Sequence, residues 1–84
     1  MDNYKKNFIR GLGEATEGTG KALSSQEVAD ALNAAGFTTS RGGTYKGGRG
    51  TDHTVSRAAS MLHEEGDDEG CEKVRRIRSL DGNY

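Results

Sequence analysis

Hydrophobic residues recur at helical spacing most clearly in residues 25–35. Apolar side chains at positions i, i+3, i+4 and i+7 line one side of a helix. Here they are Val28, Ala31, Leu32 and Ala35. Ser24, followed three residues later by Glu27, forms a capping box that predicts the start of this helix. Gly36 predicts its end, because glycine accepts the left-handed conformation found just beyond many helices.

A second segment, residues 52–65, repeats the same apolar spacing. Its apolar positions are Val55, Ala58, Ala59 and Leu62. Thr51 or Asp52 is expected to cap its start, and Gly66 follows its last turn. Serine and threonine are frequent at the other positions, although they lower helix propensity without contributing to a core. We therefore expect this outer face to contact a polar partner, with exposure to water alone as the alternative.

The N-terminal residues 3–15 carry a looser helical pattern. The apolar positions are Tyr4, Phe8, Ile9 and Leu12. Gly11 and Gly13 each weaken a helix by about 1 kcal/mol relative to alanine. We expect a helix that frays into the link of residues 17–20.

Charge order predicts a short helix over residues 68–78. Acidic side chains come first and basic ones last, as the helix dipole favours. Glu69–Lys73 and Glu72–Arg76 are pairs at the favourable i, i+4 spacing. Beyond this helix, Asp81-Gly82 is a tight-turn dipeptide, so residues 79–84 could form a short β-hairpin.

These elements predict a mainly α fold with a helix-turn-helix core of three to four helices and a rudimentary C-terminal wing. All 84 residues fit one small domain. The two clear apolar stripes are expected to pack face to face, and Phe8, Leu12 and Phe37 to close the core. Leu, Ile, Val and Phe together number only 12 of the 84 residues, so a homodimer could be needed to complete so small a core.

Composition argues against several classes of protein. No apolar run approaches the ~20 residues that cross a bilayer, and the start of the chain lacks the apolar stretch of a signal peptide. We therefore expect a cytoplasmic protein without a membrane partner. The chain is too short to build walls around a deep pocket, so we expect neither an enzyme nor a cofactor. His53, His63 and Cys71 lack metal-site spacing, and a single cysteine allows no internal disulfide.

The most unusual stretch is the glycine-rich, basic segment 38–50. It contains five glycines, Tyr45 and three basic residues, Arg41, Lys46 and Arg49. Glycine lets a backbone approach a partner closely, and basic side chains bind phosphates. Nucleic-acid contact is therefore the favoured interpretation, with a passive connector as the alternative.

Turn and cap residues join the two clear helices in a recognisable order. They read L-N-x-x-G, then T-x-R-G-G-aromatic, then the start of the next helix. The residues are Leu32, Asn33, Gly36, Thr39, Arg41, Gly42, Gly43, Tyr45, Thr51 and Val55. Residues 24–62 thus resemble the DNA-binding region of serine recombinases, and the helix order resembles small helix-turn-helix and winged-helix regulators of phages and prophages. The recombinase catalytic domain has no counterpart here, and the link of residues 36–51 exceeds the usual three- or four-residue turn.

The resemblance and the basic clusters together imply a sequence-specific regulator of transcription that binds double-stranded DNA, of phage or prophage type, in the cytoplasm of a bacterial host. Residues 52–57 are expected to enter the major groove, and Arg57 to pair with a guanine. The expected DNA-binding residues are Arg41, Lys46, Arg49, Thr51, His53, Thr54, Arg57, Arg75, Arg76 and Arg78.

The alternative function is a small phage protein that binds or inhibits a host protein through its acidic residues 64–72. Residues 61–72 carry a charge of −6, although the net charge of the chain is only −1. The sequence pI of about 6.1 also favours this alternative, because domains dedicated to nucleic acid have pI values above about 9.

Overall fold

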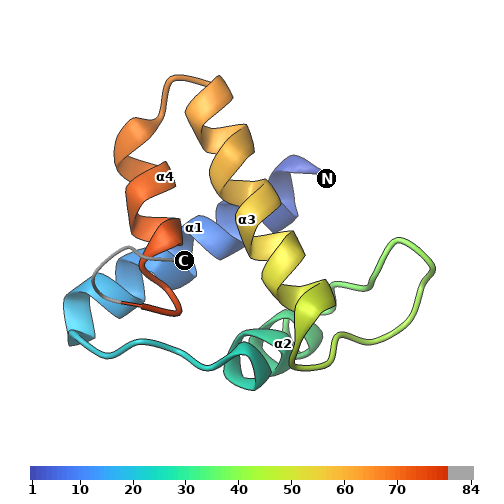
Figure 1. Cartoon of the computed structure of the whole chain (residues 1–84). Helices are drawn as coiled ribbons and strands as arrows, with labels where there is room; N and C mark the ends of the chain where they lie inside the picture. The colour runs from blue at the N-terminus through green and yellow to red at the C-terminus, as the bar shows by residue number, and fades with distance from the viewer. Residues whose placement is uncertain (80–84) are drawn as a thin grey trace.

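The computed structural model describes residues 1–79, and these residues form four helices and no strand (Figure 1). The helices are α1 (Asn3–Thr19), α2 (Ser25–Ala34), α3 (Arg49–Glu64) and α4 (Asp68–Arg75). α3 contacts the other three helices, α1 crosses behind α3 and α4, and α2 lies beside the start of α3 (Figure 1). The mainly α expectation is confirmed. The hairpin expected around Asp81-Gly82 lies outside the described residues.

Local signals placed α2 correctly. The Ser24 hydroxyl accepts from the Glu27 amide at 3.1 Å, and the Glu27 carboxylate accepts from the Ser24 amide at 2.9 Å. Gly36 follows the helix with a φ of 87°, a left-handed conformation that a side chain would strain. Both ends of the helix are therefore specified within a few residues of sequence.

α3 begins three residues earlier than the sequence indicates, and its expected cap is wrong. The N-cap is Gly48, which has a φ of 130° and offers no side-chain hydrogen bond. Thr51 lies inside the helix, 1% exposed, and its hydroxyl donates to the Lys46 carbonyl at 2.6 Å. Threonine is a common cap, but here its hydroxyl instead fastens the preceding loop to the helix.

The length of the other two helices also differs from expectation. α1 extends to Thr19 and ends at Gly20, whose φ is 68°. α4 ends at Arg75, short of the predicted residue 78. The tail after α4 then turns inward, so that Ile77 is buried and its carbonyl accepts from the Leu23 amide at 2.7 Å.

Gly13 strengthens the fold rather than weakening it. A Cβ atom at this position would lie 2.8 Å from the Lys73 carbonyl carbon of α4, too close for any real side chain. A Cβ atom on Gly70 would instead meet side-chain atoms, the Asp67 carboxylate and, at 2.6 Å, the Arg10 guanidinium Nε. Gly13 therefore lets the backbones of α1 and α4 approach closely, and Gly70 leaves room for the Arg10–Asp67 contact.

One apolar core joins all four helices. Its buried members are Ile9, Val28, Ala29, Leu32, Tyr45, Val55, Ala58, Ala59, Leu62, Cys71, Val74 and Ile77. Phe8, Leu12 and Phe37 pack against it as expected, and the rings of Phe8 and Phe37 lie 5.3 Å apart between centroids. Ala31 is only half-buried, and Tyr4 is 83% exposed, so neither belongs to the core.

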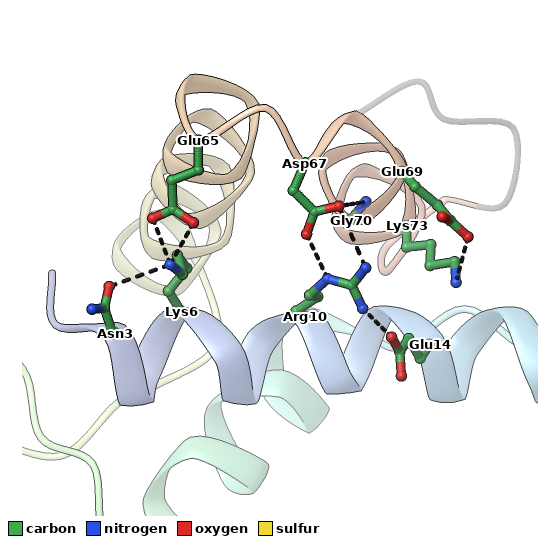
Figure 2. Close-up of polar contacts among 9 residues, drawn as sticks. All are labelled: Asn3, Lys6, Arg10, Glu14, Glu65, Asp67, Glu69, Gly70 and Lys73. Atoms are coloured by element: carbon green, nitrogen blue, oxygen red, sulfur yellow. Dashed lines mark hydrogen bonds and ion pairs between the residues drawn. The ribbon is translucent and has the colours of Figure 1, made fainter.

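Two basic residues of α1 hold the corner between α3 and α4 (Figure 2). Lys6 is 5% exposed, and its ammonium donates to the Glu65 carboxylate at 2.5 and 2.6 Å. Arg10 donates from Nε to Asp67 at 2.7 Å, and Asp67 also accepts from the Gly70 amide at 2.9 Å as the N-cap of α4. The corner is therefore fixed by charge as well as by packing.

Replacing Gly13 with alanine is expected to destabilise the protein by about 1–3 kcal/mol, because the methyl group must push α1 and α4 apart. Gly11 provides a matched control on the same helix, since nothing lies within 4 Å of a Cβ atom built there. Gly11→Ala should stabilise the protein by about 0.5–1 kcal/mol. Chemical denaturation of both variants measures this, and equal stability changes would contradict the close-approach explanation.

Candidate nucleic-acid interface

A groove of about 600 Å³ opens between the start of the chain, the loop of residues 39–47 and the first turns of α3. The α3 side of the groove is one helical face. It consists of Gly50, His53, Thr54 and Arg57. The opposite face of α3 is buried in the core through Val55, Ala58 and Leu62. Burial of one face thus determines which side chains the helix presents to the groove.

The loop of residues 39–47 is fastened to α2 by paired hydrogen bonds. The Asn33 side chain accepts from the Tyr45 amide at 2.7 Å and donates to the Tyr45 carbonyl at 2.9 Å. Further along, the Gly47 amide donates to Gln26 at 3.1 Å and the Gly48 amide donates to Ser25 at 2.7 Å. The idea of a passive connector does not fit this set of contacts, because they hold the loop in one position.

Lys5 of α1 closes the other side of the loop. Its ammonium donates to the Thr38 carbonyl at 2.9 Å and lies 5.3 Å from the centre of the Tyr45 ring. The Tyr45 hydroxyl donates to the same carbonyl at 3.2 Å, and the tyrosine is only 6% exposed. Sequence reasoning missed Lys5, and no local pattern could have found it, since its partners lie 33 or more residues away.

The basic side chains around the groove have no acidic partners. Within residues 1–79, no ion pair involves Arg41, Lys46, Arg49 or Arg57. The described residues that line the groove include no aspartate or glutamate. The groove side of the protein therefore carries uncompensated positive charge.

The acidic run of residues 61–72 has, by contrast, partners within the chain. Four of its carboxylates form ion pairs with lysine or arginine, and Asp68 contacts the His63 ring at 2.8 Å. The ion pairs are Glu65–Lys6, Asp67–Arg10, Glu69–Lys73 and Glu72–Arg76. The two pairs expected at i, i+4 spacing in α4 are confirmed. Figure 2 shows that the Glu65 and Asp67 pairs reach across to α1.

The structure brings together only some of the residues expected to bind DNA. Lys46, His53, Thr54 and Arg57 line the groove. Arg41 and Arg49 are exposed beside it, on the loop and at the first position of α3. Thr51 is wrongly included, because its side chain is buried and bonded to the loop.

The three C-terminal arginines do not line the groove. Arg76 pairs with Glu72, and Arg75 donates to the Cys71 sulfur at 3.4 Å. Arg78 forms an ion pair with Asp52 in the first turns of α3. Arg78 therefore anchors the tail after α4 to α3.

Hydrogen bonding shifts the pKa values of three charged groups. The guanidinium of Arg10, followed by the Gly70 amide, lowers the pKa of Asp67 below its ordinary value. The hydrogen bond to Asp67 in turn raises the pKa of Arg10. The Ser24 amide and hydroxyl lower the pKa of Glu27 in the capping box. All three shifts belong to residues that hold the fold.

The described residues offer neither a metal site nor a membrane-spanning helix. No cluster of three or more histidine, cysteine, aspartate or glutamate side chains in residues 1–79 could hold a metal ion. Among the helices of that same part of the chain, none has the length and apolar character needed to span a membrane.

Comparisons with protein families, with curated proteins and with solved structures each find no match to this chain. The resemblance of residues 24–62 to serine recombinases therefore depends on the quoted residues alone.

Asn33→Ala is expected to loosen the loop, because the Tyr45 amide and carbonyl both lose their partner, at a cost of about 1–3 kcal/mol for each buried group left unsatisfied. Trypsin should then cut faster after Arg41 and Lys46 under native conditions. Asn7→Ala on the exposed face of α1 is the control. If both variants were cut at the parental rate, the loop would not depend on the Asn33 contacts.

The lowered pKa of Asp67 predicts how stability depends on pH. The carboxylate of Asp67 binds a proton more readily in the unfolded chain than in the folded protein. The ion pair therefore stabilises the fold above about pH 4, and this stabilisation is lost as the pH falls further. Asp67→Asn keeps an N-cap acceptor but removes the charge. Its unfolding free energy should fall less steeply with acidification than that of the parent. Glu64→Gln, which removes a charge that has no ion pair within residues 1–79, is the control, and parallel curves for Asp67→Asn and the parent would contradict this account.

Proposed function

We propose that this protein binds double-stranded DNA through α3 and the loop that precedes it, as a sequence-specific regulator. The observation that carries the proposal is the separation of charge within the fold. Five acidic side chains on or beside α1 and α4 pair with lysine or arginine, whereas Arg41, Lys46, Arg49 and Arg57 have no carboxylate partner among residues 1–79. Phosphate contacts of this kind supply most of the affinity of a protein for DNA.

In this proposal, α2 and α3 act as a variant of the helix-turn-helix motif. α3 exposes His53 in its second turn and Arg57 at the start of its third, and the N-terminal part of a recognition helix is the part that contacts bases. Arg57 suits the O6 and N7 atoms of guanine, because a guanidinium donates two parallel hydrogen bonds. The long loop takes the place of the short turn, and its contacts with Asn33 and Ser25 hold it beside α3. Arg41 and Arg49 then suit the phosphates that flank the major groove.

The surface favours a duplex over a single strand. Proteins that bind single strands stack bases on exposed aromatic rings. Tyr45, the aromatic residue that lines the groove, is 6% exposed and has Lys5 over its ring. No exposed ring is therefore offered to a base within the described groove.

The low net charge of −1 does not oppose this proposal. The field that a ligand meets depends on where charges lie, and charges paired within about 4 Å largely cancel at a distance. The same pairing weakens the alternative of a host-protein inhibitor, because four of the six carboxylates in residues 61–72 already have lysine or arginine partners. The recombinase-like residues and the helix order also support a phage-type regulator over an inhibitor.

Substitutions of Arg49 and Arg57 are expected to differ in kind. Arg49→Ala should weaken binding to all duplexes alike and lower the slope of log affinity against log salt by about one unit, since one phosphate contact is lost. Arg57→Ala should lose about 1–3 kcal/mol on a duplex selected by the parent and less on random duplex. Titrations at two salt concentrations measure both effects.

Lys21→Ala is the matched control, because it removes the same charge from the exposed link between α1 and α2, outside the groove. It should leave the preference for the selected duplex unchanged. The proposal fails if the parent has no affinity for duplex at low salt. It also fails if Arg57→Ala and Lys21→Ala have equal effects.

A further inference from the structure

The groove beside α3 gathers more charged and polar groups than its own structure uses. Three cationic side chains, Lys5, Lys46 and Arg57, line it from three separate parts of the chain, together with the imidazole of His53. Within residues 1–79, the side chains of Lys46, His53 and Arg57 make no ion pair. The hydrogen bonds around the groove also leave these three side chains unused. Like charges held in one concave site repel each other, and a bound anion is the usual way to relieve that repulsion.

Neutral donors complete the lining. Ser40 and Thr44 also line the groove, and their hydroxyls have no hydrogen-bond partner among the described residues. Lys5 uses one of its three ammonium protons on the Thr38 carbonyl, so two protons are left for a ligand. A tetrahedral anion with several acceptor oxygens matches such a set of charged and neutral donors.

We infer that this groove is a binding site for phosphate groups, which a DNA backbone or a free phosphorylated small molecule could supply. The volume of about 600 Å³ lies within the ~300–1,000 Å³ range of small-molecule sites and is large enough for a nucleotide-sized ligand. The inference goes beyond the proposed function, because it holds for a free ligand whether or not the protein reads a duplex. Since Arg57 belongs to both surfaces, a free ligand in the groove competes with DNA.

The loop contacts make this a preformed site. Asn33 and Lys5 hold the loop from α2 and α1, so the donors of residues 40–46 are in place before any ligand arrives. A site that needs little ordering loses less conformational entropy on binding. Lys46→Ala is therefore a clean test. Within residues 1–79, the hydrogen bond of Lys46 is made by its backbone carbonyl, which accepts from Thr51 and is retained in alanine.

The test follows amide resonances of Ser40, Thr44 and Gly50 during titration with inorganic pyrophosphate, with AMP and with a short duplex. We expect these amide resonances to shift saturably with pyrophosphate or AMP. Lys46→Ala should lower the affinity measured from these shifts by about tenfold or more. Lys21→Ala, which removes a charge outside the groove, should leave this affinity unchanged. Duplex should displace the small ligand.

Each other outcome is decisive as well. Shifts at these amides with duplex alone, weakened by Lys46→Ala, support the site and identify the DNA backbone as the source of phosphate. Unchanged groove amides with every probe overturn the inference, and so do equal losses in Lys46→Ala and Lys21→Ala, which indicate diffuse charge attraction. If duplex binds with discrimination by Arg57 while the groove amides do not move, the proposed function stands and the phosphate site does not.

Discussion

The contact of α1 with the corner between α3 and α4 is the constraint on which the rest of the structure depends. Lys6 is almost fully buried, and a buried ammonium is tolerable only beside an opposite charge, which Glu65 supplies. Arg10 binds Asp67, and Asp67 in turn caps α4. Gly13 lets the backbone of α1 approach that of α4, and Gly70 leaves room for the Arg10–Asp67 contact. Without α1 in this position, α3 and α4 would cover the core on one side only.

The same contact separates the charges of the protein. Lys6 and Arg10 of α1 form ion pairs with Glu65 and Asp67, which lie close to α1 in space but far from it in the sequence. Glu69 and Glu72 of α4 pair with basic residues of their own helix at i, i+4 spacing. Within residues 1–79, the basic residues Arg41, Lys46, Arg49 and Arg57 of the loop and of α3 have no such carboxylate partner, although the net charge of the chain is only −1.

The sequence predicted those features whose causes are local. α2 was placed to within a residue because Ser24, Glu27 and Gly36 act over three or four positions. The start of α3 was misplaced for two reasons: Gly48 is held by Ser25, which lies 23 residues away, and the Thr51 hydroxyl donates to the Lys46 carbonyl instead of capping the helix. Threonine has two uses at a helix start, as a cap or as a bond to preceding backbone, and spacing alone does not distinguish them.

The candidate site also contains residues that local patterns predict and residues that only the tertiary fold reveals. Lys46, His53, Thr54 and Arg57 could be found because basic composition and helical period are visible along the chain, and the structure brings them into one groove. The contribution of Lys5 could not be found, since it depends on where α1 crosses the loop. The partners of Glu65 and Asp67 could not be found for a similar reason, because they lie on α1, 59 and 57 residues away in the sequence.

The glycines of the loop also have a different role from the one their number suggests. Many glycines in a segment usually mean a mobile chain, since glycine loses the most conformational freedom on folding. Here a Cβ atom on Gly47 would lie 2.9 to 3.0 Å from Gln26, and Gly48 adopts a φ of 130° that other residues rarely reach. These glycines allow the loop to lie against α2 and to enter α3 directly. That placement holds Lys46 at the groove that Arg57 also lines, so the glycines that give the chain its conformational freedom also let the loop be held in one position.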